Sequence, residues 1–365
     1  MNILYVTNLS GSKWAGPNNS VPNQISAQAQ FDNVFWYNLN NSNIQNQSGD
    51  TKCYGINDYP TLYITDLPYP FNKPDLVIFQ GLYFYNYCKL GNECRRYNIP
   101  YIIIPRSSLT SYAQRSKYIK KKIGNLLFFN RFIKGASSIQ YLTLNEYKES
   151  QGSRWNENNI IIPNGIKPKT PILKEKQESK LRGIFIGRLD VYQKGIDLFL
   201  QACQKLKEKL LKSNCIIEIY GPDYSDNKKI IESLILDKEL NDIVILKGPV
   251  FDKEKENIII NSDFFILTSR FEGHPMGLIE ALSYGIPCLV TKGTNMAEEI
   301  ETSGAGWTAD FNIDSIVNAF QSLLIENESI EEKGKAALEL SKKYSWNKIG
   351  KDSSEKYKKV AEKTR

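Results

Sequence analysis

The chain has 365 residues, of which 41% are hydrophobic and 24% are charged, a composition typical of a globular protein with two domains rather than of a disordered chain. No apolar run approaches the roughly 18–20 residues that a membrane-spanning helix needs, and six cysteines without a CxxC pair exclude a disulfide scaffold and indicate a reducing cytosol. The net charge of +7 lies in residues 1–164, which hold 16 basic and 9 acidic residues.

The first half alternates short apolar runs with polar, helix-forming segments, a pattern that predicts βαβ units. Its opening run, 2–7, has no positive flank and stops at Asn8, so we expect a buried first strand and not a signal peptide. A glycine-containing loop at 10–17 and a helix near 19–30 follow. The other strands predicted in this half are 34–37, 75–79 and 100–104.

A polar stretch from Gly165 to Lys180 marks the predicted domain boundary, after which the alternation restarts. We therefore expect an α/β protein with two Rossmann-like domains, the first at 1–165 completed by a C-terminal helix at 346–365, and the second at 166–345. The elements predicted in the second domain are strands at 183–187, 215–220, 243–246, 264–267 and 287–291, and helices at 195–212, 228–240 and 278–284.

Two cations, Arg188 and Lys194, lie in the loop that follows the strand at 183–187. Ligands of open α/β sheets bind at the carboxyl ends of strands, where a guanidinium and a mobile ammonium suit an anion such as a diphosphate. The alternative is that both are solvated surface cations.

A second cluster follows the strand at 264–267 and contains two carboxylates, Glu272 and Glu280. The intervening glycines and Pro275 let the backbone approach a ligand and begin a helix, whose free N–H groups attract phosphate. Carboxylate oxygens also suit the vicinal hydroxyls of a sugar. The alternative is a charged loop and a glutamate favoured by the helix dipole.

Together these motifs, Gly-Arg-x5-Lys-Gly at 187–195 and Glu272-x7-Glu280, resemble the retaining nucleotide-sugar glycosyltransferases of family four, which have the GT-B fold. Further segments resemble the family in the expected order: 162–166, 219–222, 246–250 and 344–346. The resemblance implies two Rossmann-like domains that face each other across a cleft, with a C-terminal helix crossing back to the first domain.

The resemblance also implies roles for individual residues. Arg188 and Lys194 would bind and stabilise the leaving diphosphate, Glu272 would hold the donor sugar, and these three are the expected catalytic residues. Gly16 would approach the diphosphate from the first domain, and Glu280 would hold the ribose hydroxyls. The full set expected to bind the donor is Gly16, Arg106, Gly221, Lys247, Gly248, Val250, Gly273, His274, Pro275, Met276, Gly277, Leu278 and Glu280.

The sequence departs from many members of this family, which carry a histidine in the first domain near the donor sugar. The one histidine here, His274, lies in the second domain, and Arg106 takes the other position by rough alignment. No cluster of histidine and cysteine and no Asp-x-Asp is present, so we expect no metal and no other cofactor.

The segment 106–134 is strongly basic, since no acidic residue occurs between Glu93 and Glu146 while ten basic residues do. Apolar residues such as Phe128 and Phe129 are interleaved with its lysines, a pattern that suits an anionic membrane surface. The alternative is an apolar stripe that faces the core below a solvated basic face. A nucleic-acid partner is not expected, because no recognition module accompanies the charge.

We therefore expect a cytoplasmic enzyme, peripheral on the inner face of the cell membrane, that transfers a hexosyl or N-acetylhexosaminyl group with retention. Its donor would be a nucleoside diphosphate sugar, with UDP favoured, and its acceptor a saccharide, lipid-linked or protein-linked, in cell-surface polysaccharide or glycoconjugate synthesis. One rival is an epimerase or phosphorylase of the same fold. Another is a catalytically silent partner subunit or a saccharide-binding module.

Overall fold

The computed structural model describes residues 1–12, 16–40, 51–115, 117–169, 180–223 and 225–364. The chain divides into two compact units, the first formed by Met1–Gly165 with Trp346–Arg365 and the second by Ile166–Ser345. Parts of the predicted loop at 10–17 and of the polar stretch at 165–180 lie outside the described residues.

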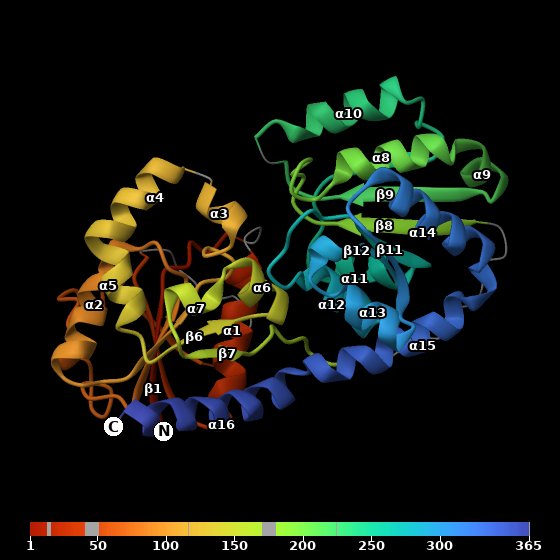
Figure 1. Cartoon of the computed structure of the whole chain (residues 1–365). Coiled ribbons are helices and arrows are strands. Elements are labelled where there is room, and N and C mark those ends of the chain that lie inside the picture. The colour runs from red at the N-terminus through yellow and green to blue at the C-terminus, as the bar shows by residue number, and fades with distance from the viewer. Residues whose placement is uncertain (13–15, 41–50, 116, 170–179, 224, 365) are drawn as a thin grey trace. The chain divides into compact units, whose positions relative to one another are not determined.

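The first unit is built on a parallel sheet of seven strands in the order β3-β2-β1-β4-β5-β6-β7 (Figure 1). Its central strands β1, β4 and β5 are almost wholly apolar and buried, because a parallel sheet is covered by helices on both faces. The strands are β1 (Asn2–Thr7), β2 (Asn33–Asn38), β3 (Cys53–Gly55), β4 (Leu76–Gln80), β5 (Tyr101–Ile104), β6 (Ser138–Tyr141) and β7 (Asn159–Ile161).

The helices of the first unit include a long C-terminal helix, α16, that packs against α1 (Figure 1). The contact is close, since a Cβ at Gly350 would lie 2.6 Å from the Ala27 carbonyl oxygen, and Tyr357 is fully buried. The helices are α1 (Gly16–Gln28), α2 (Tyr85–Arg96), α3 (Ser111–Arg115), α4 (Tyr118–Gly124), α5 (Asn130–Lys134), α6 (Leu144–Glu149), α7 (Gly152–Trp155) and α16 (Trp346–Thr364), with a 3-10 turn at Ile64–Asp66 and a π turn at Asn125–Phe129.

The second unit is a parallel sheet of six strands in the order β10-β9-β8-β11-β12-β13. The order reverses between β8 and β11, so the carboxyl ends of these two strands form the switch point at which open α/β sheets bind ligands. The strands are β8 (Leu181–Ile186), β9 (Cys215–Tyr220), β10 (Val244–Leu246), β11 (Phe264–Leu267), β12 (Cys288–Thr291) and β13 (Gly306–Ala309).

Helices α8 to α13 of the second unit connect successive strands, as βαβ topology requires, and α14 and α15 follow the last strand. The helices of this unit are α8 (Ile196–Lys205), α9 (Lys207–Lys212), α10 (Asn227–Asp237), α11 (Asp252–Ile260), α12 (Met276–Ser283), α13 (Ala297–Ser303), α14 (Ile313–Ile325) and α15 (Ile330–Ser341), with 3-10 turns at Lys292–Thr294, Asn327–Ser329 and Lys342–Tyr344.

Most predicted elements occur within one to three residues of the expected bounds, and the prediction of an α/β protein with two parallel sheets is confirmed. The single helix predicted at 195–212 is wrong, because the chain leaves helical geometry at Leu206 and forms two helices, α8 and α9. Strands β3, β6, β7 and β13 were not predicted, since each is only three or four residues long and mixes polar with apolar side chains.

Candidate functional site

Two loops meet at the switch point of the second sheet, one after β8 and one after β11. Gly195 ends the first loop with a φ of +64°, and a Cβ there would lie 2.0 Å from the Thr268 carbonyl oxygen. The Thr268 hydroxyl also donates to the Gly195 carbonyl oxygen at 3.1 Å. Glycine is therefore needed at 195, because only the absence of a side chain lets the two loops touch.

Lys194 and Glu272 are in direct contact at this switch point. They are two of the three expected catalytic residues and carry opposite charges. The Lys194 Nζ lies 2.5 Å from the Glu272 Oε1, and only 14% and 9% of the two side chains are exposed. The Ser269 hydroxyl donates to the same carboxylate oxygen at 2.7 Å. The ammonium and the carboxylate are thus fixed in place and largely shielded from water, which strengthens their attraction.

Arg188 belongs to the same loop and lies nearer the solvent, with 40% of its side chain exposed. It donates to the Gln193 side-chain oxygen at 2.6 Å and lies 3.6 Å from the Asp190 carboxylate. Gln193 in turn donates to the Phe271 carbonyl oxygen at 3.4 Å and accepts from the Arg270 backbone N–H. The arrangement links Arg188 to the loop that carries Glu272 through a single intervening side chain.

Three residues at the end of β12 and directly after it hold the loop after β11 and were not predicted as site residues. The Thr291 hydroxyl donates to the Ser269 carbonyl oxygen at 2.6 Å, and the Asn295 amide donates to the Glu272 carbonyl oxygen. A Cβ at Gly293 would lie 2.2 Å from the Ser269 carbonyl oxygen. Polar residues placed directly after a buried strand, beside the strand that carries the site, are the sequence signal that could have identified them.

Glu280 lies in the second turn of α12 and pairs with Lys255 of α11, whose Nζ contacts its Oε2. Among the described residues, no hydrogen bond or ion pair joins Glu280 to Lys194 or Glu272. The expected donor residues Met276, Gly277 and Leu278 form the first turn of the same helix, with Gly273 and Pro275 before it. A Cβ at Gly277 would lie 3.1 Å from the Ile186 carbonyl oxygen, so this turn packs against the end of β8.

The structure buries His274, which is 6% exposed and packs against Tyr344 with ring centroids 5.1 Å apart. Burial lowers its pKa from 6.5 to about 3, so the imidazole is neutral at pH 7. The ring therefore packs in the interior of the second unit, against Tyr344.

The buried histidine leads to a prediction for stability. Because its pKa is lowered in the folded state, the unfolded chain binds a proton more readily as the pH falls below 6.5, and the fold loses about 2 kcal/mol between pH 7 and pH 5 from this group. We expect His274→Phe, which keeps the ring contact, to remove this loss. The measurement is urea unfolding of both proteins at pH 7 and pH 5. Equal pH dependence in the two proteins would contradict a neutral buried imidazole.

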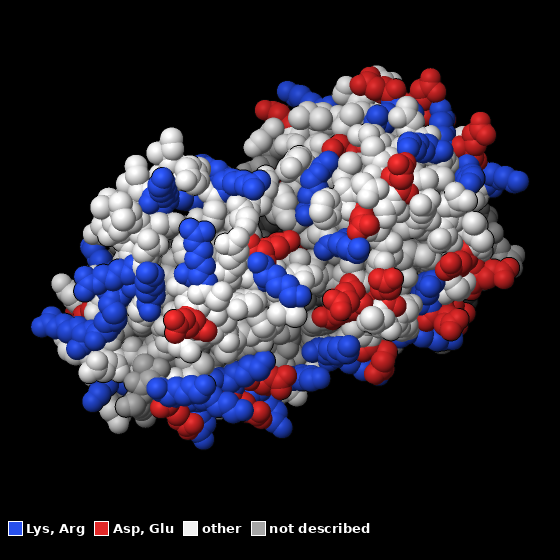
Figure 2. All heavy atoms as spheres, viewed as in Figure 1, with Lys and Arg blue, Asp and Glu red and all other residues white. Residues whose placement is uncertain are grey.

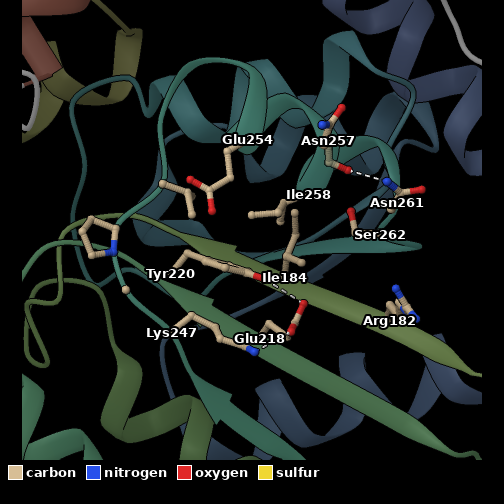
Figure 3. A pocket seen from close by; sticks show the side chains of 13 residues that line it. Arg182, Ile184, Glu218, Tyr220, Lys247, Glu254, Asn257, Ile258, Asn261 and Ser262 are labelled. Atoms are coloured by element: carbon tan, nitrogen blue, oxygen red, sulfur yellow. Dashed lines mark hydrogen bonds and ion pairs between the residues drawn. The ribbon is translucent and has the colours of Figure 1, made fainter.

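A pocket of about 740 Å³ lies on one face of the second sheet, between α11 and strands β8 and β9. Figure 3 shows Glu254 and Ile258 of α11 directed toward Tyr220 of β9. The Tyr220 hydroxyl donates to Glu218 at 2.9 Å, and Lys247 lies 3.5 Å from the same carboxylate.

The expected donor residues Lys247, Gly248 and Val250 line one end of this pocket, whereas Lys194 and Glu272 do not line it. Gly221 connects the two regions, since its N–H donates to the Gly248 carbonyl oxygen at 3.3 Å and a Cβ at 221 would lie 1.7 Å from the Gly187 carbonyl oxygen. The end of β9 is thus in contact with the end of β8.

The two expected donor residues of the first unit lie at the carboxyl edge of its sheet. Gly16 is the first residue of α1, and a Cβ there would meet no described atom within 4 Å. Arg106 follows β5 with a φ of +50°, and its guanidinium donates to side-chain oxygens on α1, at the end of β4 and after β7. These partners are Gln80, Ser20, Asn164 and Gln24.

The positively charged guanidinium of Arg106 is surrounded by the neutral side-chain amides and the hydroxyl to which it donates. Burial lowers its pKa to about 10, so it remains charged at pH 7, and the nearby carboxylate of Glu146 opposes the shift. Glu146 itself is fully buried and accepts the backbone N–H groups of Leu142 and Ser107. Arg106 therefore ties three elements of the first unit together.

Among the described residues, no group of three or more His, Cys, Asp or Glu residues is placed to hold a metal ion. No helix in the described part of the chain combines the length and the apolar character needed to cross a bilayer.

Residues 169–339 match the family described as glycosyl transferases group 1. A segment of 154 residues is 30% identical to the amylovoran biosynthesis glycosyltransferase AmsK of Erwinia amylovora, covering 40% of this chain and 36% of that protein. Another, of 234 residues, is 26% identical to the uncharacterized glycosyltransferase MJ1178 of Methanocaldococcus jannaschii, covering 61% and 62%. The chain thus spans about a third to three fifths of the length of these relatives.

Two solved structures resemble the whole chain. Sucrose-phosphate synthase from Thermosynechococcus elongatus has a TM-score of 0.74 at 15% identity, with 99% of both chains covered. Anabaena Alr3699/HepE in complex with UDP and glucose has a TM-score of 0.72 at 15% identity, with 98% of this chain and 100% of that chain covered. This likeness confirms the expected GT-B fold.

Proposed function

We propose that this chain, whose residues 169–339 match the glycosyl transferases group 1 family, transfers a sugar from a nucleoside diphosphate sugar to a saccharide, lipid-linked or protein acceptor. The observation that carries the proposal is the contact of Lys194 with Glu272 at the switch point of the second sheet, beside Arg188. The names of relatives in amylovoran and colanic acid biosynthesis support a role in polysaccharide or glycoconjugate synthesis.

In the proposed reaction, the bond from the anomeric carbon of the sugar to the β-phosphate oxygen breaks and its electron pair stays on that oxygen. A new bond forms from the same face between the anomeric carbon and an acceptor oxygen, so that the configuration is retained. The acceptor proton passes to the leaving phosphate. Lys194 and Arg188 stabilise the charge that develops on the phosphate, because prearranged cations in a shielded site need little reorganisation.

The remaining proposed roles are those that the family resemblance implies. Glu272 and the first turn of α12 hold the sugar and its phosphate, Glu280 binds the ribose, and the loop at 247–250 frames the base. In the first unit, Gly16 and Arg106 contact the diphosphate and the sugar. UDP is the favoured nucleotide, the transferred group is a hexosyl or N-acetylhexosaminyl unit, and the chemistry needs no metal.

A thermal-shift screen with UDP, GDP, ADP and TDP tests the proposed donor class. A ligand that binds only the folded state raises the melting temperature by mass action, so one nucleotide should stand out from the others. Incubation with the matching nucleotide sugar and analysis of the product anomer then separates transfer from epimerisation or phosphorolysis. Failure of all four nucleotides to raise the melting temperature would contradict the proposal and favour a silent saccharide-binding module.

The proposal includes a peripheral contact with an anionic membrane through the segment 106–134. The chain is helical from Tyr118 to Lys134, including the π turn, and Ile119, Ile123 and Leu126 recur on one face of it. Ile119 and Leu126 are 73% and 78% exposed, whereas the neighbouring Phe132 and Ile133 belong to the core. The apolar stripe is thus divided: its second half faces the core and its first half faces solvent.

The charge around this stripe suits anionic headgroups. Lys117, Lys120 and Lys122 are exposed, and Figure 2 shows Lys and Arg side chains gathered over this face of the first unit. Lys121 differs, because its Nζ contacts the Ala113 carbonyl oxygen and lies 5.3 Å from the Tyr83 ring centroid. An apolar strip flanked by lysines provides the two signals that stable membrane binding needs.

Replacing Lys120, Lys121 and Lys122 with glutamine should weaken binding to vesicles of phosphatidylglycerol and phosphatidylcholine by about thirtyfold, since the exposed Lys120 and Lys122 each contribute about 1 kcal/mol near an anionic surface. Leu126→Gln with Leu127→Gln should weaken it as well and remove the part that resists salt. The matched controls are Lys228 and Lys229 replaced with glutamine, and Leu236→Gln, all exposed on α10. Vesicle sedimentation that is indifferent to these changes and to salt would rule the contact out.

A further inference from the structure

The cation that the proposed donor needs already has an anionic partner inside the protein. The Glu272 carboxylate lies 2.5 Å from the Lys194 ammonium and accepts from the Ser269 hydroxyl at 2.7 Å. Both side chains are largely shielded from water. Their attraction is therefore stronger than that of an ion pair on the surface, which contributes little. A diphosphate that reaches Lys194 must therefore replace this carboxylate or share the ammonium with it.

We propose that Glu272 acts as a built-in competitor for Lys194 that discriminates against the spent nucleoside diphosphate and speeds its release. The inference rests on the proposed function, since it assumes that Lys194 binds the diphosphate of the donor. It assigns to Glu272 a second task, which is separate from holding the sugar. The negative charge of Glu272 repels the nucleoside diphosphate, which becomes more negative once the sugar has been transferred.

The nucleoside diphosphate product carries more negative charge than the nucleotide-sugar donor, as the proposed discrimination requires. In the donor, the β-phosphate is esterified to the sugar and carries one negative charge. When the bond to the anomeric carbon breaks, the leaving phosphate takes up the acceptor proton. That proton then dissociates to solvent, because the second ionisation of a terminal phosphate lies near pH 6, and the phosphate gains about one further negative charge at pH 7. The repulsion from a fixed carboxylate beside Lys194 therefore rises upon transfer, while the sugar hydroxyls that Glu272 can accept from leave with the product.

The surroundings of Glu272 keep the competitor in position. Ser269 is fully buried and fixes one carboxylate oxygen, and Asn295 donates to the Glu272 backbone carbonyl. The charge thus stays beside Lys194 and does not swing away when the diphosphate binds. Arg188 has a carboxylate at its side as well, but Asp190 is 3.6 Å away in a more exposed position, where screening weakens its effect.

The test compares UDP and a UDP-sugar as titrants of the wild-type chain and of Glu272→Gln in isothermal titration calorimetry. Glutamine has the size of glutamate and can still bond Ser269, but it carries no charge. We expect UDP to bind the variant about tenfold more tightly than it binds the wild type, and the UDP-sugar to gain no affinity or to lose some. Glu272→Asp, which keeps the charge, should bind UDP as the wild type does.

The control is Glu256→Gln on α11, which removes an equal charge from an ion pair with Lys169 that faces solvent, and UDP binding should stay unchanged. UDP affinity in Glu272→Gln that equals or falls below that of the wild type would overturn the inference while leaving the proposed function intact. Absence of UDP binding, and of GDP, ADP and TDP binding, in both proteins would overturn the two together. If Glu272→Gln fails to fold, Ser269→Ala provides the same test, since loosening the carboxylate should also tighten UDP binding.

Discussion

Lys194→Met is expected to lower kcat/KM for sugar transfer by about 10²–10³-fold, the usual cost of removing one group that stabilises charge in a transition state. Methionine keeps the unbranched stem of lysine but places no cation beside the leaving phosphate. The same change should lower the free energy of unfolding by about 2–4 kcal/mol, because it leaves the shielded Glu272 carboxylate without its partner.

A double-mutant cycle separates the two effects. Glu272→Gln alone should also abolish transfer with the fold intact, since glutamine retains the hydrogen bond to Ser269. Lys194→Met with Glu272→Gln should recover most of the lost stability, because no uncompensated charge remains, yet it should recover no activity. Turnover within twofold of the wild type in either single variant would remove that residue from the mechanism. Circular dichroism and urea unfolding provide the readout for the fold.

Gly195→Ala is expected to lower the free energy of unfolding by more than about 2 kcal/mol and to abolish nucleotide binding. The residue has a φ of +64°, which an alanine adopts only at a cost, and the added Cβ would lie 2.0 Å from the Thr268 carbonyl oxygen. Since a backbone atom is in the way, the two loops of the site must move apart, which takes Lys194 away from Glu272.

The matched control for this substitution is Gly248→Ala, because a Cβ at 248 would meet no atom within 4 Å and the φ of that residue is not positive. Urea unfolding should show no more than a few tenths of a kcal/mol of change for this control, while Gly195→Ala should shift the midpoint clearly. Equal stability of the two variants would mean that the loops after β8 and β11 do not depend on their close approach.

Much of the second unit could be predicted from sequence, because its strands are short apolar runs bounded by glycine and proline. The run 264–267 is β11 to the residue, and the breakers after it place α12 near its predicted start. What failed was the continuity of the helix at 195–212, since one residue with non-helical geometry, Leu206, splits it without any glycine or proline to signal the break.

The site could be predicted only where its residues are close in the chain or fall within a known motif. The loops with Lys194 and Glu272 were identified in this way, but the support from Thr291 and Asn295 depends on β12 lying beside β11, which the order of strands decides. The burial of His274 has a similar cause, since Tyr344 is 70 residues away in sequence. Composition likewise could not show that Lys121 turns inward while its neighbours face solvent.

The helix α16 has a consequence for how the protein is made. It belongs to the first unit and covers α1 at the contact between Gly350 and Ala27, although all of the second unit is translated before it. On the ribosome, the surface of α1 that α16 later covers therefore stays bare until Trp346–Arg365 has emerged, whereas Ile166–Ser345 can fold as soon as its own strands are complete. Synthesis thus favours a late completion of the amino-terminal unit, and a chain that stops before Trp346 leaves apolar surface open to aggregation.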